Sequence, residues 1–550
     1  MNTIRSSRLR VRAKITSDFG GSDAGSDARR VDGSVSLAIL DRPRNNADDP
    51  APPRPGGLRG FGSLASLLLG QRPLRVSSLV EPRQRAKSSA AKSEFIYARS
   101  LNRRQFLGGA TAGVALFHLL PGGLLRGADN VSRNEKINVA GIGIGSQGGS
   151  DIDGVAGEGH NVVALCDVDD KYAAKKYAQY PKARTFKDFR VMLDKMDKEI
   201  DAVVIGTPDH THAVISLEAM KRGKHVYCEK PLAHTVQEVR ALMSAARKFK
   251  VVTQLGNQGH SSGSIRQICE WVWAGAIGQV HTVHAGCDAF REVYSQIRNL
   301  DKVNQNYEVP AGLDYDLWIG PVPFRPYTPL WVPWNWRGWM PFGTGAVGDW
   351  FCHVIDPAFW ALDLGAPTSV HAEVTDYDPV KHGLTYPPGT KITFEFPKRK
   401  DRVALKLVWF DGVQRIPQPQ DFPADEKAPG IGAILFGEKG MIVHGSHGGG
   451  GGHLVPDKVM DQFSGKNAPQ EKIPRVKNHA WDWLEAIRNG RQAGSDFSYG
   501  GPLTQAALLG AIAVRFPGQT LRWDEEKARF TNHDDANAHL NPPYREGWSL

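Results

Sequence analysis

From Lys136 onward, short apolar segments alternate with stretches of helical character, and this alternation leaves few possible folds. Helical stretches such as 171–179 and 211–222 separate the apolar segments, and Gly223 ends the second of them. Strands that alternate with helices form parallel βαβ units. The pattern therefore predicts an α/β Rossmann domain with a doubly wound parallel sheet over residues 135–258. Its expected strands are 137–143, 161–169, 202–208, 225–231 and 251–257.

After residue 279 the apolar segments become longer and alternate in polarity, which is typical of an open sheet. We therefore expect an α+β domain with an open, mostly antiparallel sheet over residues 259–475, interrupted by a Trp-rich loop at 290–345. A C-terminal part, 476–550, is expected to pack back on the core through helices 476–489 and 503–515. The expected strands of the open sheet are 279–287, 369–376, 391–396, 403–410 and 441–445.

The first hundred residues differ in composition from the rest of the chain. They hold 18 Lys and Arg against 9 Asp and Glu, so they carry +9 of the formal net charge of +10. Few aromatic residues and no sustained periodicity predict a disordered extension over residues 1–100. Because the remaining residues are close to neutral, we expect no nucleic-acid partner.

Residues 101–130 resemble a twin-arginine export signal. Arg103 and Arg104 precede an apolar, Gly- and Ala-rich run, which predicts a periplasmic location, the alternative being a cytoplasmic protein. His118 and Pro121 interrupt the run, so no stable membrane span is expected.

The most informative short motif follows the first expected strand. Gly143, Gly145 and Gly148 have the spacing G-x-G-x-x-G, which allows a tight turn and close approach of a pyrophosphate to a helix N-terminus. With 59 glycines this spacing arises by chance about once in such a chain, so the context matters. Asp167 ends the next strand, and a carboxylate there accepts hydrogen bonds from the ribose hydroxyls of NAD and repels the 2′-phosphate of NADP. We therefore predict NAD as the cofactor in preference to NADP, with Ser146 and Gln147 of the loop beside it.

Polar residues also end the third, fourth and fifth expected strands, where ligands bind in open parallel sheets. Lys-Pro is also a common sequence of surface turns, but a lysine fixed at this edge can donate a proton or orient a substrate, and its position modestly favours a functional role. The predicted cofactor contacts at these strand ends are Thr207, Pro208, His212, Glu229, Lys230 and Asn257.

Asp349 and His353 are four residues apart, so on a helix they share one face. A carboxylate beside an imidazole holds its tautomer and raises its basicity, which suits a general base. Taken alone, such a pair is more often structural than catalytic.

Taken together, the ordered motifs resemble the glucose-fructose oxidoreductase/inositol dehydrogenase (Gfo/Idh/MocA) family. The resemblance extends over residues 135–550, and the C-terminal segments are similar to those of export-tagged members common in planctomycete-type bacteria. It implies a catalytic group of Lys230, Asp349 and His353, in which His353 removes a hydroxyl proton, Lys230 polarises the oxygen and Asp349 orients His353. The motifs that carry it are Gly143–Gly148, Asp167, TPDHTH (207–212), EKP (229–231), GNQ (256–258) and GTGAVGDWFCHVID (343–356).

Two further segments leave alternatives open. The Trp-rich loop suits stacking of a sugar ring, with Trp334, Trp336 and Arg337 as candidate substrate contacts, but it suits a rigid lid equally well. Three histidines in the Gly-rich run 444–453 are of a type that binds metal ions, but their flexible spacing fixes no geometry. Five scattered cysteines without a C-x-x-C pair indicate neither a disulfide framework nor a zinc knuckle. We therefore expect no metal.

The leading hypothesis is an NAD-dependent oxidoreductase that moves a hydride between nicotinamide and a hydroxyl carbon of a sugar, sugar derivative or cyclitol. Export would require a tightly bound cofactor, since the periplasm holds no NAD pool. The alternative is an NAD-dependent glycosidase that oxidises the sugar ring transiently with no net redox change. A non-catalytic NAD-binding protein is the third and least favoured hypothesis. By resemblance, we also expect a homo-oligomer, either a dimer or a tetramer.

Overall fold

The apolar strands predicted before residue 258 form one parallel sheet in the computed structural model, which describes residues 135–400 and 402–550. Its strand order is β3-β2-β1-β4-β5-β6, the order of a Rossmann fold, so the predicted fold is confirmed. Only the short strand β3 escaped prediction, because three partly exposed residues give no periodicity. The strands are β1 (Asn138–Ile142), β2 (Asn161–Cys166), β3 (Arg184–Phe186), β4 (Ala202–Ile205), β5 (His225–Cys228) and β6 (Thr253–Leu255).

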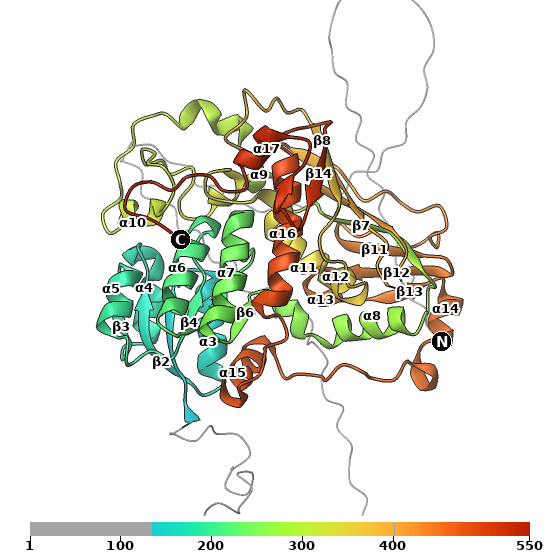
Figure 1. Cartoon of the computed structure of the whole chain (residues 1–550), viewed down its shortest axis with the longest axis horizontal. Helices are drawn as coiled ribbons and strands as arrows, with labels where there is room; N and C mark the ends of the chain where they lie inside the picture. Colours follow the sequence, from blue (N-terminus) through green and yellow to red (C-terminus); the bar gives the residue numbers. More distant parts are fainter. Residues whose placement is uncertain (1–134, 401) are drawn as a thin grey trace, which may run out of the picture. The chain divides into compact units, whose positions relative to one another are not determined.

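Helices connect these strands and cover the sheet (Figure 1). The first of them forms although its sequence is poor in helix formers, since its small residues pack closely on β1, β2 and β4. The helices are α3 (Gln147–Gly157), α4 (Asp170–Gln179), α5 (Phe189–Lys195), α6 (Asp209–Lys221) and α7 (Val236–Phe249).

A nine-stranded sheet follows, in the order β13-β12-β11-β7-β10-β9-β8-β14-β15. All its pairs are antiparallel except β7 with β10, so the expected open, mostly antiparallel sheet is confirmed. The strands are β7 (Val280–Cys287), β8 (Ser369–Thr375), β9 (Gly389–Phe396), β10 (Leu405–Gly412), β11 (Ile431–Gly437), β12 (Gly440–Gly445), β13 (His453–Val455), β14 (Thr520–Asp524) and β15 (Arg529–Phe530).

The helices of the second half lie between the two sheets and around the second one. Helix α16 contacts α7 of the first half and α11 and β8 of the second, and Figure 1 shows it running between the two sheets. The helices are α8 (Gly263–Trp273), α9 (Arg291–Tyr294), α10 (Tyr315–Ile319), α11 (Gly345–Val354), α12 (Asp356–Ala361), α13 (Ser446–Gly449), α14 (Asp457–Gln462), α15 (His479–Asn489), α16 (Phe497–Ala513) and α17 (Asp534–Ala538). The short 3-10 helices are η3 (Gln258–Ser261), η4 (Ile297–Lys302), η5 (Asn335–Gly338) and η6 (Gly465–Asn467).

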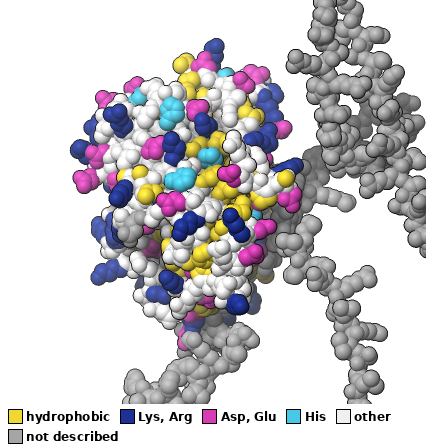
Figure 2. All heavy atoms as spheres, turned by 90° about the vertical axis from the view of Figure 1, so that its right-hand side faces the viewer, with side chains coloured by type: hydrophobic (Ala, Val, Ile, Leu, Met, Phe, Trp, Pro, Cys, Tyr) yellow, Lys and Arg dark blue, Asp and Glu magenta, His cyan; other side chains and the backbone are white. Residues whose placement is uncertain are grey.

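The two faces of the nine-stranded sheet bury different apolar clusters. Leu407 and Trp409 of β10 point toward the main core, while Val408 and Phe410 point to the outer face. Part of the outer face is covered by segment 413–430 of the same chain, which contributes to the same outer cluster. On the side seen in Figure 2, hydrophobic side chains form a central band among charged ones.

The predictions for the extension 1–100 and for the export signal 101–130 concern a part of the chain outside the described residues. Within residues 135–400 and 402–550, none of the helices combines the length and apolarity that crossing a membrane requires.

Candidate active site

A cavity of about 350 Å³ lies at the carboxyl ends of β1, β2, β4 and β5, beside α11 and the Trp-rich loop. It brings together most of the side chains and backbone positions that the motifs predicted. The predicted residues that line it are Gly143, Gly145, Ser146, Gln147, Asp167, Thr207, Pro208, Glu229, Lys230, Trp334, Trp336, Arg337, Asp349 and His353.

The three glycine positions of the loop have no space for a side chain. Gly143 has a φ of +75°, and a Cβ there would lie 2.7 Å from the backbone nitrogen of Thr207. A Cβ on Gly148 would lie 2.2 Å from the Gly143 carbonyl oxygen and 2.9 Å from the Cα of Gly206. Gly148 therefore lies behind the cavity wall, where it lets helix α3 approach β1 and β4.

Asp167 occupies the end of β2 at the mouth of the loop. Its carboxylate accepts hydrogen bonds from the backbone N–H groups of Ile144 (2.8 Å) and Asp169 (3.0 Å). Burial raises the pKa of Asp167 to about 6, so the carboxylate is mostly ionised at neutral pH. A tight glycine turn, a helix N-terminus and a ribose-facing carboxylate fit an NAD molecule.

Lys230 and Asp349 form the charged centre of the cavity. Lys230 Nζ lies 2.5 Å from Asp349 Oδ1, and the other carboxylate oxygen accepts a hydrogen bond from Tyr294 (2.6 Å). Arg337 Nε lies 3.3 Å from the same oxygen. The carboxylate thus has two cations and one hydroxyl around it.

The predicted role of Asp349 needs a correction at this point. No hydrogen bond joins it to His353, because its two oxygens face Lys230, Tyr294 and Arg337. His353 Nδ1 is buried and has no hydrogen-bond partner among the described residues. Spacing along a helix placed both side chains at the cavity, but longer-range partners decided what Asp349 contacts. Asp349 therefore fixes Lys230 and does not orient His353.

These contacts set the protonation states. Burial acts to raise the pKa of Asp349, but the charges of Lys230 and Arg337 outweigh it and hold that pKa well below its usual range. Burial acts to lower the pKa of Lys230, but the neighbouring Asp349 raises it overall. Burial and the charge of Lys230 lower the pKa of His353 well below its usual value. At neutral pH the site therefore combines a fixed ammonium group with a neutral imidazole, which can accept a proton.

Glu229 belongs to a second acidic group at the cavity wall. Gln258 Nε2 donates to Glu229 (2.6 Å) and to Asp151 (3.3 Å), so two carboxyl groups lie around one amide. Burial and the charge of Asp151 raise the pKa of Glu229 well above its usual value. Burial raises the pKa of Asp151 to about 6. This pair can hold a proton beside the predicted cofactor site.

Two of the predicted cofactor contacts support the cavity from behind. The His212 ring lies 2.8 Å from the carbonyl oxygens of Thr207 and of Pro231, so it ties together two strand ends. Asn257 is fully buried, with its amide nitrogen 3.0 Å from Asp356 and its oxygen accepting from Ser495 (2.7 Å). Neither side chain lines the cavity.

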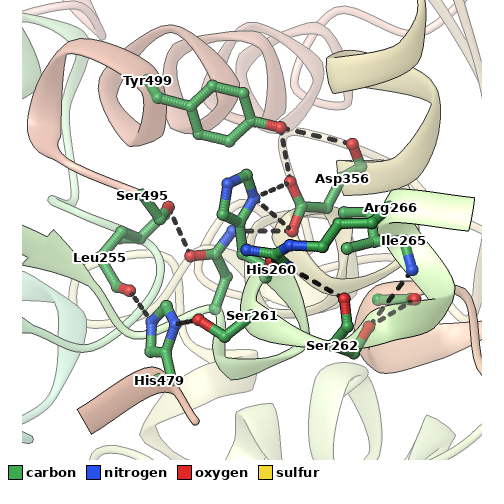
Figure 3. A network of polar contacts seen from close by, with 12 residues as sticks. Leu255, His260, Ser261, Ser262, Ile265, Arg266, Asp356, His479, Ser495 and Tyr499 are labelled. Carbon is green, nitrogen blue, oxygen red and sulfur yellow. Dashed lines mark hydrogen bonds and ion pairs between the residues drawn. The ribbon is translucent and has the colours of Figure 1, made fainter. Parts of the chain in front are cut away.

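Asp356 is the centre of the buried network shown in Figure 3. His260 Nδ1 lies 3.0 Å from its carboxylate, and the hydroxyl of Tyr499 donates to it at 2.6 Å. The neighbouring His479 ring connects Ser261 with the carbonyl of Leu255. The network joins the end of the Rossmann sheet to α12, α15 and α16.

Several residues of the cavity escaped the sequence analysis. Asp209 lies inside the quoted TPDHTH motif and accepts hydrogen bonds from the backbone and hydroxyl of Thr344 (3.1 and 2.8 Å). The cavity residues that the sequence analysis did not assign to this site are Tyr172, Tyr294, Phe290, Trp350 and His447. Trp350 lies inside the quoted motif 343–356, and His447 was considered only as one of three histidines that could bind a metal.

The Trp-rich loop has a buried part and a part that lines the cavity. Trp318, Trp331 and Trp339 are buried in an aromatic cluster that makes the loop rigid. Trp334 and Trp336 flank Arg337, whose guanidinium carbon lies 3.9 Å and 4.2 Å from their ring centres. Packing thus holds Arg337 against Asp349. Among the described residues no group of three or more histidine, cysteine or acidic side chains is placed to bind a metal.

Comparisons with family models match both halves of the chain. Residues 137–257 match the oxidoreductase family with an NAD-binding Rossmann fold, and residues 266–400 match the C-terminal alpha/beta domain of the same family. The chain therefore belongs to the Gfo/Idh/MocA oxidoreductase family, and NAD is the cofactor that its Rossmann domain is built to bind.

Curated relatives match the chain over part of its length. A levoglucosan dehydrogenase of Pseudarthrobacter phenanthrenivorans is 27% identical over 216 residues, which are 39% of this chain and 45% of that protein. Inositol 2-dehydrogenase 2 of Saccharopolyspora erythraea is 32% identical over 154 residues, or 27% of this chain and 45% of that protein. The chain thus spans a little under half the length of these relatives.

Among solved structures, the aldose-aldose oxidoreductase of Caulobacter crescentus in complex with glycerol aligns with 70% of this chain and all of that chain. Its TM-score is 0.47 and its identity 17%.

Proposed function

We propose that the protein is an NAD-dependent oxidoreductase that acts on a secondary hydroxyl group of a sugar, sugar derivative or cyclitol. The observation that carries the proposal is the convergence of Lys230, Asp349 and His353 in the cavity that the glycine loop and Asp167 also line. The names of the curated relatives, a levoglucosan and an inositol dehydrogenase, support this substrate class.

The protonation states of Lys230 and His353 assign them different roles in the reaction. Bound NAD supplies the hydride acceptor. Lys230, held by Asp349, donates a hydrogen bond to the substrate oxygen and stabilises negative charge on it. His353, whose pKa lies well below its usual value, is neutral and removes the hydroxyl proton. Trp334, Trp336 and Arg337 form the wall at which the substrate ring binds.

A substrate panel tests the proposal. Purified protein is incubated with NAD and with myo-inositol, levoglucosan, D-glucose or glycerol, and NADH formation is followed by absorbance. We expect at least one cyclic polyol to be oxidised and glycerol to be inert. Release of the aglycone from an aryl glycoside without net NADH formation would instead identify the glycosidase, and inactivity with every compound would contradict both.

We further propose export through the twin-arginine route with a tightly bound cofactor, which rests on Arg103, Arg104 and the apolar run after them. Replacing both residues by lysine should leave the protein in the cytoplasm in cell fractionation. Mass spectrometry of the exported wild-type protein should detect NAD, and a cofactor-free exported protein would contradict the proposal.

We also propose that the protein is a homo-oligomer that pairs through the outer face of the nine-stranded sheet. Phe436 is only partly buried there beside the apolar outer cluster. Light scattering should give a dimer or tetramer for the wild type and a smaller species for Phe436→Glu. A monomeric wild type would contradict this proposal.

A further inference from the structure

The Gly-rich run of β12 and α13 contributes a side chain to the reacting end of the cavity. His447 lines this cavity and is exposed. Its ring stacks on that of His353, with ring centres 4.1 Å apart and an interplanar angle of 24°. Trp350 meets both rings edge-on, at 5.7 Å from His447 and 6.1 Å from His353. These contacts place His447 directly beside the base of the proposed reaction.

The glycines explain how the loop reaches this position. Gly448 and Gly449 have φ values of +82° and +76°. A Cβ on Gly448 would lie 2.0 Å from the carbonyl oxygen of Gly259, and one on Gly449 would lie 2.3 Å from Ile268. Ser262 also donates a hydrogen bond to the Gly448 carbonyl (3.0 Å). The run is thus a fixed turn seated on η3 and α8.

The backbone of His447 is itself held in an unusual conformation. Its φ of +52° and ψ of +55° fall in the left-handed region, which residues other than glycine rarely adopt. Such strain persists where the surrounding structure imposes it, and it concentrates at functional sites. Here it directs the ring toward His353 and into the cavity.

One ring nitrogen of His447 is available to a ligand. Nδ1 lies 2.6 Å from the Ser446 hydroxyl, while Nε2 has no hydrogen-bond partner in the part of the chain that the structure describes. Although the residue is exposed at the cavity, partial desolvation of its ring and the charge of Lys230 lower the pKa of His447. The ring is therefore neutral at neutral pH and can donate or accept one hydrogen bond at Nε2.

We propose that His447 is a second substrate-contacting imidazole, whose Nε2 hydrogen-bonds a hydroxyl next to the carbon that is oxidised and whose ring holds His353 in place. The inference rests on the proposed function. It assigns to the Gly-rich run a role in selecting substrates with a hydroxyl on the carbon adjacent to the reacting one, a feature shared by sugars and cyclitols.

Two substitutions separate the two roles of His447. His447→Phe keeps an aromatic ring against His353 but removes Nε2, so the KM for a cyclic polyol should rise about tenfold with kcat nearly unchanged. His447→Gln keeps a polar group at the position of Nε2 but removes the stack, so kcat should fall about tenfold with a smaller change in KM. His453→Asn, in the same run but outside the cavity, is the matched control and should change neither constant.

Binding provides a readout that does not depend on turnover. Myo-inositol and levoglucosan are titrated into the NADH-loaded protein and NADH fluorescence is recorded, with thermal melting to show that each variant is folded. The proposal predicts about tenfold weaker binding by folded His447→Phe and unchanged NADH affinity.

The outcomes are distinct. If the wild type oxidises a polyol but His447→Phe keeps its KM and its polyol affinity, the inference about His447 fails alone. If the wild type binds the polyol without oxidising it and His447→Phe binds it more weakly, the proposed oxidoreductase fails and the contact is confirmed. If neither polyol binds to the wild type, both proposals are overturned.

Discussion

Asp349 and Asp356 lie seven residues apart on consecutive helices. Each carboxylate is buried near a histidine and accepts a hydrogen bond of 2.6 Å from a tyrosine hydroxyl. Around Asp349 the other partners are two cations, Lys230 and Arg337, at the wall of a cavity. Around Asp356 they are His260 and an amide, sealed from solvent.

The different surroundings of the two carboxylates indicate different roles, one in catalysis and one in stability. A carboxylate that fixes a lysine beside a cavity holds a positive charge at the place where negative charge forms on the substrate during the reaction. Enzymes stabilise transition states in this way. A carboxylate whose oxygens accept hydrogen bonds from buried donors stabilises the local structure, because local unfolding would leave both the carboxylate and the donors without hydrogen-bond partners. The first region is built for chemistry and the second for holding the Rossmann sheet to α12 and α16.

The strongest test of the cavity side is Lys230→Met. It removes the cation that polarises the substrate oxygen, so kcat should fall by about 10²- to 10⁴-fold in steady-state assays of NADH formation. Lys221→Met, on the exposed end of α6, is the control. Activity within tenfold of the wild type would remove Lys230 from the mechanism.

The network side is tested by stability. Asp356→Ala leaves His260, Asn257 and Tyr499 without their shared acceptor, and the free energy of unfolding should fall by about 3–5 kcal/mol in urea titrations. Asp349→Asn should cost less, because Lys230 and Arg337 open onto the cavity, where water solvates them. Equal losses in the two variants would mean that the two regions do not differ in the way described.

A third prediction concerns Arg337. Arg337→Lys keeps the charge but loses the planar group held between Trp334 and Trp336, so kcat/KM should fall by about tenfold. Arg325→Lys, on the same loop, is the comparison variant and should have little effect. An unchanged kcat/KM for Arg337→Lys would show that the planar guanidinium group of Arg337 is not needed for activity.

The smallest effect is expected from pH. Because the pKa of Asp167 is about 6, the ionised form that accepts ribose hydroxyls is lost below that pH, and the Kd for NADH should rise by about tenfold between pH 7 and pH 5. Asp167→Asn should bind NADH more weakly at pH 7 and show a flatter profile. Fluorescence titrations measure both, and an identical pH dependence in the variant would assign the effect to another group.

Without bound cofactor, the raised pKa of Asp167 has the opposite effect on the stability of the fold: lowering the pH increases stability, whereas it weakens NADH binding. The pKa of Asp167 in the folded protein lies above its ordinary value of 3.8, so folding binds a proton between these two pH values. The stability contributed by protonated Asp167 is present below about pH 4 and is lost as pH rises through about 6.

Much of the Rossmann half could be predicted because its signals are local. A buried parallel strand is a continuous apolar run, and its carboxyl end falls at the binding edge of the sheet whatever the rest of the chain does. Gly143, Asp167 and Lys230 were therefore placed correctly at one cavity without any knowledge of contacts. The wall formed by Tyr294, Trp350 and His447 was not predicted. Tyr294 and His447 lie in segments too short to show a periodicity, and the position of Trp350 on α11 does not by itself show what its ring contacts.

The sequence by itself determined the parallel sheet apart from β3, five strands of the second sheet, the glycine turn and the set of polar strand ends, because side-chain periodicity and backbone sterics act between near neighbours. Only the tertiary structure decided that Asp349 pairs with Lys230, 119 residues away, and not with His353, four residues away. It also decided that the side chain of Asn257 points into the network around Asp356 and that the Gly-rich run places His447 at the cavity. A buried carboxylate takes the partners that best stabilise its charge, and packing, not spacing along a helix, brings them within reach.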